Sequence, residues 1–343
     1  MSLAGLLLGL SFSGLASAHF AAWHKGMYCL NGTIRGEDDP DTNAIVNPLF
    51  NLTKSDWWFH AYNGCNELPP AEGDFLELPA NGNFTVELAV NRAFTTLSYG
   101  GVRVAAFGDG ENYTNGLGGV DCITELNIHT QNESMAAGTA FAISYQSDMS
   151  AVTPENLVVF TTLYHTPWKR LATYQVPNLP ACPENGCICA WGWVPNGCGE
   201  PNMYMQGYRC KVVGKTGSAA LAPAAPATWC EGAPGSCTKG ARQMIFWHQL
   251  DGNNIDVSGS DSHGDPKSPA YNSVLGFAEG AQTDIFMNDG TASATSVAPG
   301  RPTASGTPGV QNGAWSLWRC PWYAPWCLLF FLGGLVVSLV EDF

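Results

Sequence analysis

The chain is 343 residues long, and its 15 basic and 29 acidic residues give a formal net charge of −14. No basic stripe that could neutralise phosphates is present in the sequence, so nucleic acid is excluded as an expected partner. Only 13% of residues are charged, whereas 39 are glycine and 22 are proline. This composition suits an extracellular protein that acts on neutral or insoluble material through amides, hydroxyls and glycans.

Residues 1–18, MSLAGLLLGLSFSGLASA, have an apolar centre, no charged side chain and an ending of the A-x-A type. This pattern predicts a secretory signal peptide that is removed after Ala18. Export is also indicated by five N-glycosylation sequons, which begin at Asn31, Asn51, Asn83, Asn112 and Asn132. We therefore expect a secreted glycoprotein whose mature chain begins at His19.

A histidine at the first position of a mature chain can bind a metal through two of its own nitrogens. Its α-amine and its imidazole close a six-membered chelate ring, and because the amine has a pKa of about 8, a metal can displace its proton near neutral pH. A second histidine would complete a T-shaped set of three nitrogens, which favours Cu(II) over zinc or magnesium. The sequence thus predicts a histidine brace that holds one copper ion per chain, with His19 as its first ligand.

Further along the chain, short stretches of β-branched and aromatic residues alternate with polar ones between Gly, Pro and Asn clusters. They cover residues 84–90, 138–146, 157–164, 171–176 and 204–213. Helical periodicity is scarce, so the pattern predicts an all-β fold, an antiparallel β-sandwich. The segments from about 30 to 80 and from 215 to 280 are irregular and contain cysteines, which predicts long loops pinned by disulfides.

Two of the twelve cysteines, Cys320 and Cys327, lie near the C-terminus, and the other ten could form five bridges within the folded part. Four of those ten lie between residues 182 and 198, where they could be mistaken for a zinc site. Their spacing is not that of a zinc knuckle pair, and an exported chain is oxidised. We therefore expect disulfides.

The composition of the sequence changes at about residue 283. Residues 283–314 are rich in small polar residues and predict a flexible linker. Residues 315–343 form a hydrophobic tail that ends in the mostly apolar run Cys327–Val340 and follows the small residues at 312–314. This arrangement predicts a GPI-anchor signal that would attach the protein to a membrane. A membrane span that starts near Pro321, or a plain hydrophobic tail, are the alternatives.

Two stretches resemble a known family: HFAAWHKGMYCLNG, from residue 19, and CPENGCICAWGWVPNGCGEPNMYMQGYRC, residues 182–210. Both are similar to the lytic polysaccharide monooxygenases of auxiliary activity family 14, which are fungal secreted copper enzymes. The resemblance covers residues 19 to about 280, so we expect one catalytic domain over 19–282. It implies an immunoglobulin-like β-sandwich and a copper-dependent oxidoreductase.

The same resemblance implies the reaction and its partners. We expect oxidative cleavage of plant cell-wall polysaccharide, namely xylan associated with cellulose, with an external electron donor and O2 or H2O2, by a monomeric enzyme. A rival hypothesis is a cell-surface histidine-brace protein that binds copper for acquisition or wall biology without cleaving polysaccharide. A third is a cell-wall-binding β-sandwich without metal. N-terminal sequencing and a search for oxidised oligosaccharides would separate the three.

Five histidines are candidates for the second brace ligand: His24, His60, His129, His165 and His248. His24 is too close to His19 in the chain for both to reach one metal easily, and His60 is flanked by aromatic residues that suggest packing. In the related enzymes this histidine stands just before a strong strand, so the resemblance selects His129. His165, at the end of a predicted strand, is the alternative.

The axial position of this enzyme class is commonly a tyrosine next to a glutamine, in a Q-x-Y arrangement. Gln206-Gly207-Tyr208 supplies that arrangement here, and residues i and i+2 of a strand share one face. We therefore expect Tyr208 beneath the metal and Gln206 within hydrogen-bond reach of the reacting oxygen species. Tyr204 lies on the same face of the strand and is the alternative to Tyr208.

Overall fold

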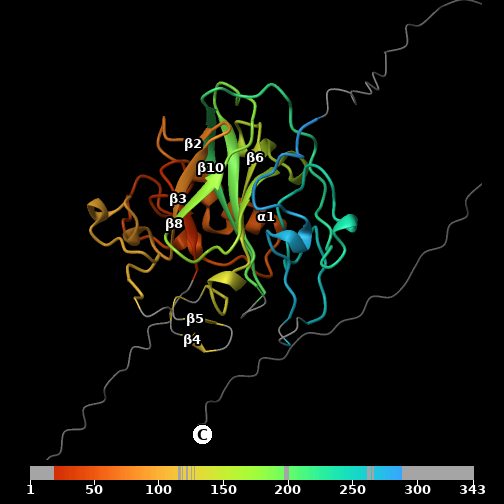
Figure 1. Ribbon diagram of the computed structural model, residues 1–343. Coiled ribbons are helices and arrows are strands. Elements are labelled where there is room, and N and C mark those ends of the chain that lie inside the picture. The colour runs from red at the N-terminus through yellow and green to blue at the C-terminus, as the bar shows by residue number, and fades with distance from the viewer. Residues whose placement is uncertain are drawn as a thin grey trace, which may run out of the picture. The chain divides into compact units, whose positions relative to one another are not determined.

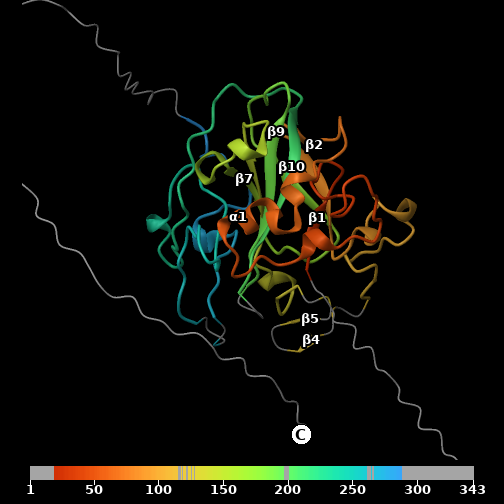
Figure 2. The ribbon, with the colours of Figure 1, turned by 180° about the vertical axis from the view of Figure 1, so that it is seen from behind.

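The structure, a computed structural model, describes residues 19–287 with the exception of 115, 116, 118, 121, 122, 125, 127, 197–200, 261–263 and 265. The expected signal peptide, the hydrophobic tail and the linker beyond residue 287 lie outside the described residues. Within the described part, two β-sheets face each other (Figures 1 and 2). The predicted all-β sandwich is therefore confirmed.

A three-stranded sheet has the order β1-β3-β8, with β1 at Ala21–Trp23, β3 at Asn83–Ala89 and β8 at Leu171–Gln175. The six-stranded sheet has the order β11-β7-β6-β9-β10-β2. Its strands are β11 (Gly280–Ala281), β7 (Val158–Leu163), β6 (Thr139–Ser144), β9 (Cys187–Trp193), β10 (Tyr204–Val213) and β2 (Leu76–Pro79). All pairs in these two sheets are antiparallel except β2 with β10, which is parallel.

The core between the two sheets is built from inward-facing aromatic and aliphatic residues. Phe84 of β3 packs edge-on against Phe141 of β6, and Tyr174 of β8 stacks on Phe84. These residues belong to one buried cluster with side chains of both sheets. A second cluster lies on the other face of the six-stranded sheet, where residues 244–247 and 271–277 cover β6 and β9. The late segments in cyan and blue occupy that side in Figure 1.

Five strands were predicted, and all five are present within two residues of the expected bounds. The prediction missed β1 because three residues are too short to show a period. It also missed β9, since its sequence, CICAWGW, is buried on both faces and shows no alternation with polar residues. A hairpin of two short strands, β4 (Gly119–Val120) and β5 (Ile123–Thr124), lies at one end of the sandwich in both views (Figures 1 and 2).

Within the described ranges, the connecting segments contain one short α-helix, α1 (Lys54–Trp57), and several 3-10 turns. The 3-10 turns are η1 (Ala44–Val46), η2 (Trp58–Asn63), η3 (Cys65–Glu67), η4 (Arg92–Phe94), η5 (Tyr99–Gly101), η6 (Glu133–Met135), η7 (Met149–Ala151), η8 (Pro154–Asn156), η9 (Pro234–Ser236) and η10 (Ser273–Leu275). The regions from 30 to 80 and from 215 to 280 are largely irregular, as predicted.

Disulfides pin these loops, as the cysteine count predicts. Among the described residues the bridges are Cys29–Cys65, Cys182–Cys187, Cys189–Cys210 and Cys230–Cys237. Three of the four cysteines between residues 182 and 198 are thus disulfide-bonded, which confirms the expectation of bridges there. Cys122 and Cys198 lie outside the described residues.

The surface of the described part agrees with an exported protein in one respect: the asparagines of all five sequons are exposed. Asn132 also caps η6, since its side-chain oxygen accepts the main-chain N–H of Met135 at 3.2 Å. Among the described residues, no helix has the length and apolar character to cross a membrane.

Candidate metal centre

His19 lies two residues before Ala21, where β1 begins, and its imidazole contacts a tyrosine at the start of β10. The hydroxyl of Tyr204 lies 2.7 Å from Nδ1 of His19, and the two ring centroids are 5.9 Å apart. Burial raises the pKa of the Tyr204 phenol well above its usual value, and the nearby Tyr62 adds to this. The phenol is therefore neutral near pH 7 and can donate its proton to Nδ1.

His129 brings a second imidazole to the same place. Its ring centroid lies 6.2 Å from that of His19, and the two ring planes differ by only 16°. His129 is buried, and the loop that carries it is held by Ile128, which belongs to the core between the sheets. Asn196 ties the same loop to the end of β9, since its side-chain amide donates to the carbonyl oxygen of Met135 at 2.6 Å.

Trp193, the last residue of β9, packs against both Tyr204 and His129. It stacks on Tyr204 with a centroid distance of 4.4 Å and meets the His129 ring edge-on at 5.9 Å. Trp193 and Tyr204 are direct cross-strand neighbours in the β9–β10 pairing. The sequence-based prediction did not include Trp193, although the hairpin spacing and the shared parity could have indicated it. The indole fixes the orientation of two candidate ligands at once.

The donor set suits a metal that prefers nitrogen ligands. A metal bound between two imidazoles, at about 2 Å from a nitrogen of each, separates the ring centroids by roughly 6 Å, which agrees with the observed 6.2 Å. Nδ1 of His19 is also the nitrogen that closes a six-membered chelate with the α-amine of the same residue. The residues present therefore fit a copper ion held by His19 and His129, with the Tyr204 hydroxyl next to it.

No group of three or more His, Cys, Asp or Glu side chains converges anywhere in the part of the chain that the structure describes. A brace does not need such a group, because two imidazoles, a main-chain amine and a phenol make up its donors. The described residues thus offer this site for copper rather than an all-side-chain zinc or calcium cage.

The other candidate histidines have different surroundings. Nδ1 of His24 accepts the main-chain N–H of Gly26 at 3.1 Å, and burial lowers the pKa of His24 to about 4. His60 is fully buried in η2, where its Nδ1 lies 3.1 Å from the side-chain oxygen of Asn63. Burial likewise lowers the pKa of His60 to about 4. Both are neutral at pH 7 and are held within their own loops.

His165 and His248 are exposed residues of turns. His165 follows β7 and meets only the edge of Tyr164 among the ring contacts of the described residues. His248 stacks on Phe50 at 5.4 Å. The structure therefore brings His129 to His19 and does not bring His165 there.

The predicted axial pair, Gln206 and Tyr208, lies deeper in the sandwich than expected. Tyr208 is fully buried and donates its hydroxyl to the carbonyl oxygen of Ala22. Gln206 is also fully buried, and its amide is bound to main-chain groups of Phe20 and Ala22. The alternative residue, Tyr204, is the one that contacts His19. Tyr204 and Tyr208 point to the same face of β10, four residues apart, and they contact different parts of the N-terminal segment.

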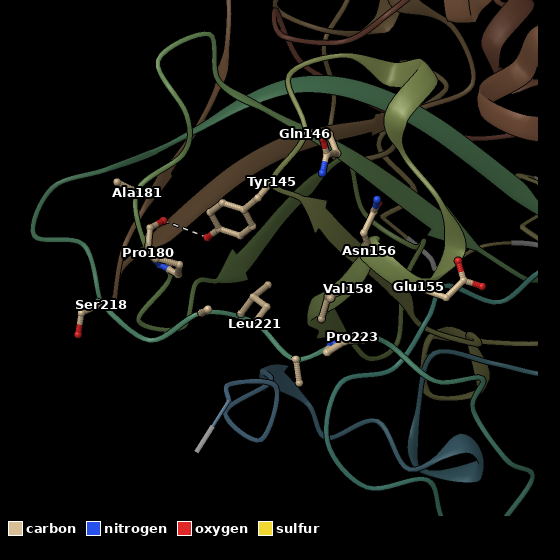
Figure 3. Close-up of a pocket in the computed structure, with 12 residues that line it drawn as sticks. Tyr145, Gln146, Glu155, Asn156, Val158, Pro180, Ala181, Ser218, Leu221 and Pro223 are labelled. Carbon is tan, nitrogen blue, oxygen red and sulfur yellow. Dashed lines mark hydrogen bonds between the residues drawn. The ribbon is translucent and has the colours of Figure 1, made fainter. Parts of the chain in front are cut away.

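A separate cavity of about 630 Å³ opens beyond Ser144, the last residue of β6 (Figure 3). Its lining is mostly apolar and includes Tyr145, Val158 and Leu221. The Tyr145 hydroxyl donates to the carbonyl oxygen of Pro180 at 2.9 Å. None of the predicted site residues lines this cavity, so it is distinct from the centre around His19.

Comparison with known proteins gives one family. The model of the family described as lytic polysaccharide monooxygenase AA14 matches residues 2–316. The chain is 35% identical over 312 residues to AA14 family lytic polysaccharide monooxygenase A of Trametes coccinea, a match that covers 88% of this chain and 69% of that protein. It is 36% identical over 289 residues to AA14 family lytic polysaccharide monooxygenase B of Pycnoporus cinnabarinus, covering 81% of this chain and 72% of the relative.

A third relative, AA14 family lytic polysaccharide monooxygenase B of Talaromyces rugulosus, is 36% identical over 292 residues, which cover 79% of this chain and 94% of that protein. The family match over residues 2–316 includes the sandwich and the segment that carries His19. They agree with a centre whose donors fit copper. The chain therefore belongs to the AA14 family of lytic polysaccharide monooxygenases, copper-dependent oxidoreductases that cleave polysaccharides.

Proposed function

We propose that this chain is a secreted monooxygenase that holds one copper ion and cleaves xylan associated with cellulose. The observation that carries the proposal is the pairing of the His19 and His129 rings, nearly parallel at 6.2 Å, with the Tyr204 hydroxyl 2.7 Å from Nδ1 of His19. Family membership supports the copper and the polysaccharide, and the resemblance of the sequence to its relatives supports xylan as the substrate.

Removal of residues 1–18 is part of this proposal, because it creates one of the ligands. In the unprocessed chain the nitrogen of His19 belongs to a peptide bond and is a poor metal donor. After cleavage it becomes an α-amine with an ordinary pKa of about 8. The amine and Nδ1 of His19 would then bind the ion together, and His129 would supply the third nitrogen.

Tyr204, in preference to Tyr208, is the tyrosine that would lie next to a bound ion. Its phenol is neutral and lies next to His19, whereas the hydroxyl of Tyr208 is used by Ala22. Copper, when bound, would supply the one-electron chemistry by which O2 or H2O2, with electrons from an external donor, can oxidise a C–H bond of the polysaccharide. In the copper-free protein the Tyr204 hydroxyl donates to Nδ1 of His19, and Trp193 packs against Tyr204 and His129 and so orients both side chains.

The test is an assay of the processed protein, loaded with copper, on three substrates: xylan-coated cellulose, cellulose alone and soluble xylan. We expect oxidised oligosaccharides from xylan-coated cellulose only when both copper and a reductant are present. The matched control is His129→Ala, which removes one imidazole of the proposed centre. Oxidised products from cellulose alone would show that cellulose, rather than xylan, is the substrate. Tight copper binding without oxidised products from any polysaccharide would instead favour a copper-acquisition protein.

A further inference from the structure

β1 is an edge strand, and its outer edge is buried. It pairs with β3 on one side only, and Ala22, at its centre, has no exposed surface. A buried strand edge leaves main-chain N–H and C=O groups that need hydrogen-bond partners. In this chain the partners are side chains from β10, on the opposite sheet.

Gln206 takes the place of a peptide group along this edge. Its Oε1 accepts the main-chain N–H of Ala22 at 2.9 Å, and its Nε2 donates to the carbonyl oxygen of Phe20 at 3.1 Å. The same Nε2 lies 3.4 Å from the carbonyl oxygen of Ile45. The hydroxyl of Tyr208 then donates to the carbonyl oxygen of Ala22. Both Gln206 and Tyr208 are fully buried, so water does not compete for these bonds.

The spacing of β10 matches the spacing of the N-terminal segment. Tyr204, Gln206 and Tyr208 point to one face of the strand, and consecutive members of this series are about 6.6 Å apart. Tyr204 contacts His19, and Gln206 and Tyr208 contact the main chain of residues 20 to 22. Three consecutive inward side chains of one strand thus hold three of the first four residues that follow Ala18, namely His19, Phe20 and Ala22.

We propose that Gln206 and Tyr208 are positioning residues that fix the His19 α-amine and imidazole in the geometry of the metal centre. A first residue is joined to the protein by a single peptide bond, so the placement of His19 depends on how firmly the carbonyl of Phe20 is held. This role rests on the proposed copper function. It replaces the expectation that Gln206 acts on the reacting oxygen species, because the Gln206 amide is bound to main-chain groups.

The experiment compares Gln206→Met and Tyr208→Phe with a matched control, Tyr174→Phe. Tyr174 lies in the same core, but its hydroxyl is bound to Thr139 and accepts the indole N–H of Trp191, with no bond to β1. Copper affinity is measured by titration, and the Cu(II) environment by electron paramagnetic resonance. Hydrogen exchange of β1 amides is measured on the copper-free proteins.

We expect copper to bind about 10- to 100-fold more weakly in Gln206→Met. This is the typical cost of losing an outer partner, that is, a residue that supports a metal ligand without touching the metal. Tyr208→Phe loses a single hydroxyl, so its affinity should fall less, with an altered Cu(II) spectrum. Both variants should exchange the β1 amides faster than the wild type. Tyr174→Phe should keep the wild-type affinity, spectrum and β1 exchange, even where its melting temperature falls.

Equal losses of copper affinity in Tyr208→Phe and Tyr174→Phe would overturn the proposal, as would wild-type β1 exchange in both Gln206→Met and Tyr208→Phe. If Gln206→Met does not fold, the comparison of the two tyrosine variants decides. If the wild type binds no copper, the proposed function fails, and the exchange measurement still tests whether these side chains hold β1.

Discussion

Along β10, residues that point between the two sheets and residues that point away from them meet different partners. Tyr204, Gln206 and Tyr208 point inward, and each forms a hydrogen bond with the segment from His19 to Ala22. On the outward face, Met205 belongs to an apolar cluster, and Gly207 leaves just enough room for the Phe59 ring. By our proposal the inward face sets the geometry of the metal centre, whereas the outward face contributes packing. Changes on the two faces should therefore separate copper binding from stability.

The largest effect is expected for the proposed ligands that the inward face supports. His19→Ala and His129→Ala each remove one nitrogen donor. Copper affinity should fall by more than about 100-fold, beyond the cost of losing an outer partner. Titration of copper into the purified proteins measures this. His165→Ala is the control, since that ring is exposed in a turn. Retention of copper by His129→Ala together with its loss in His165→Ala would make His165 the second ligand.

The free energy of unfolding is expected to depend on pH through His60 of η2, the segment whose Phe59 contacts the outward face of β10. Burial lowers the pKa of His60 from 6.5 to about 4 in the folded protein. The unfolded chain takes up a proton below pH 6.5 that the folded protein does not. The stabilising contribution is therefore complete above pH 6.5 and is lost as the pH falls towards 4. Its size is about 3.5 kcal/mol, at about 1.4 kcal/mol for each pKa unit.

Urea unfolding of the copper-free protein at several pH values checks this contribution. His60→Gln should make the free energy of unfolding less dependent on pH between 6.5 and 4, by the equivalent of one proton. The same slope in the wild type and the variant would show that His60 does not titrate in this way.

Gly207→Ala tests the packing of the outward face directly. A Cβ at this position would lie 2.8 Å from Cδ1 of Phe59 and 3.0 Å from Cε of Met149, so one of them has to move. Overpacking of this kind costs about 1–3 kcal/mol of unfolding free energy. Copper affinity of the folded variant should stay at the wild-type value. A loss of copper affinity as large as that of Gln206→Met would mean that the two faces are not independent.

The smallest effect on affinity is expected for Tyr204→Phe. An axial phenol binds weakly and at long range, so copper affinity should fall by less than about tenfold. The Cu(II) resonance spectrum should nevertheless change, because the oxygen next to His19 is lost. An unchanged spectrum in Tyr204→Phe would remove Tyr204 from the axial position.

The sequence predicts the alternation of β10 and the five main strands, since period-two patterns are local. It does not show how far along the strand a given residue lies from the edge of the sandwich. Tyr204 and Tyr208 point to the same face of β10 and are about 13 Å apart along the strand, and only their contacts with His19 and with Ala22 distinguish them. β9 was missed because CICAWGW is buried on both faces, and with it the role of Trp193.

His19 was recognised from its place after an A-x-A sequence, which is a chemical signal rather than a structural one. His129 needed the family resemblance, because the distance between two loops is not encoded in either of them. The left-handed backbone of His129, with a φ of 50°, would not have identified it, since His60, His165 and His248 share that conformation.

The measurement that tests the central claim most directly is a copper titration of two chains that differ by one residue. One chain begins at His19, and the other retains Ala18 in front of it, which turns the α-amine of His19 into an amide. We predict that the first binds one copper ion per chain and that the second binds more than about 100-fold more weakly, beyond the loss expected for an outer partner. Equal copper binding by the two chains would contradict a centre built on the N-terminal amine of His19.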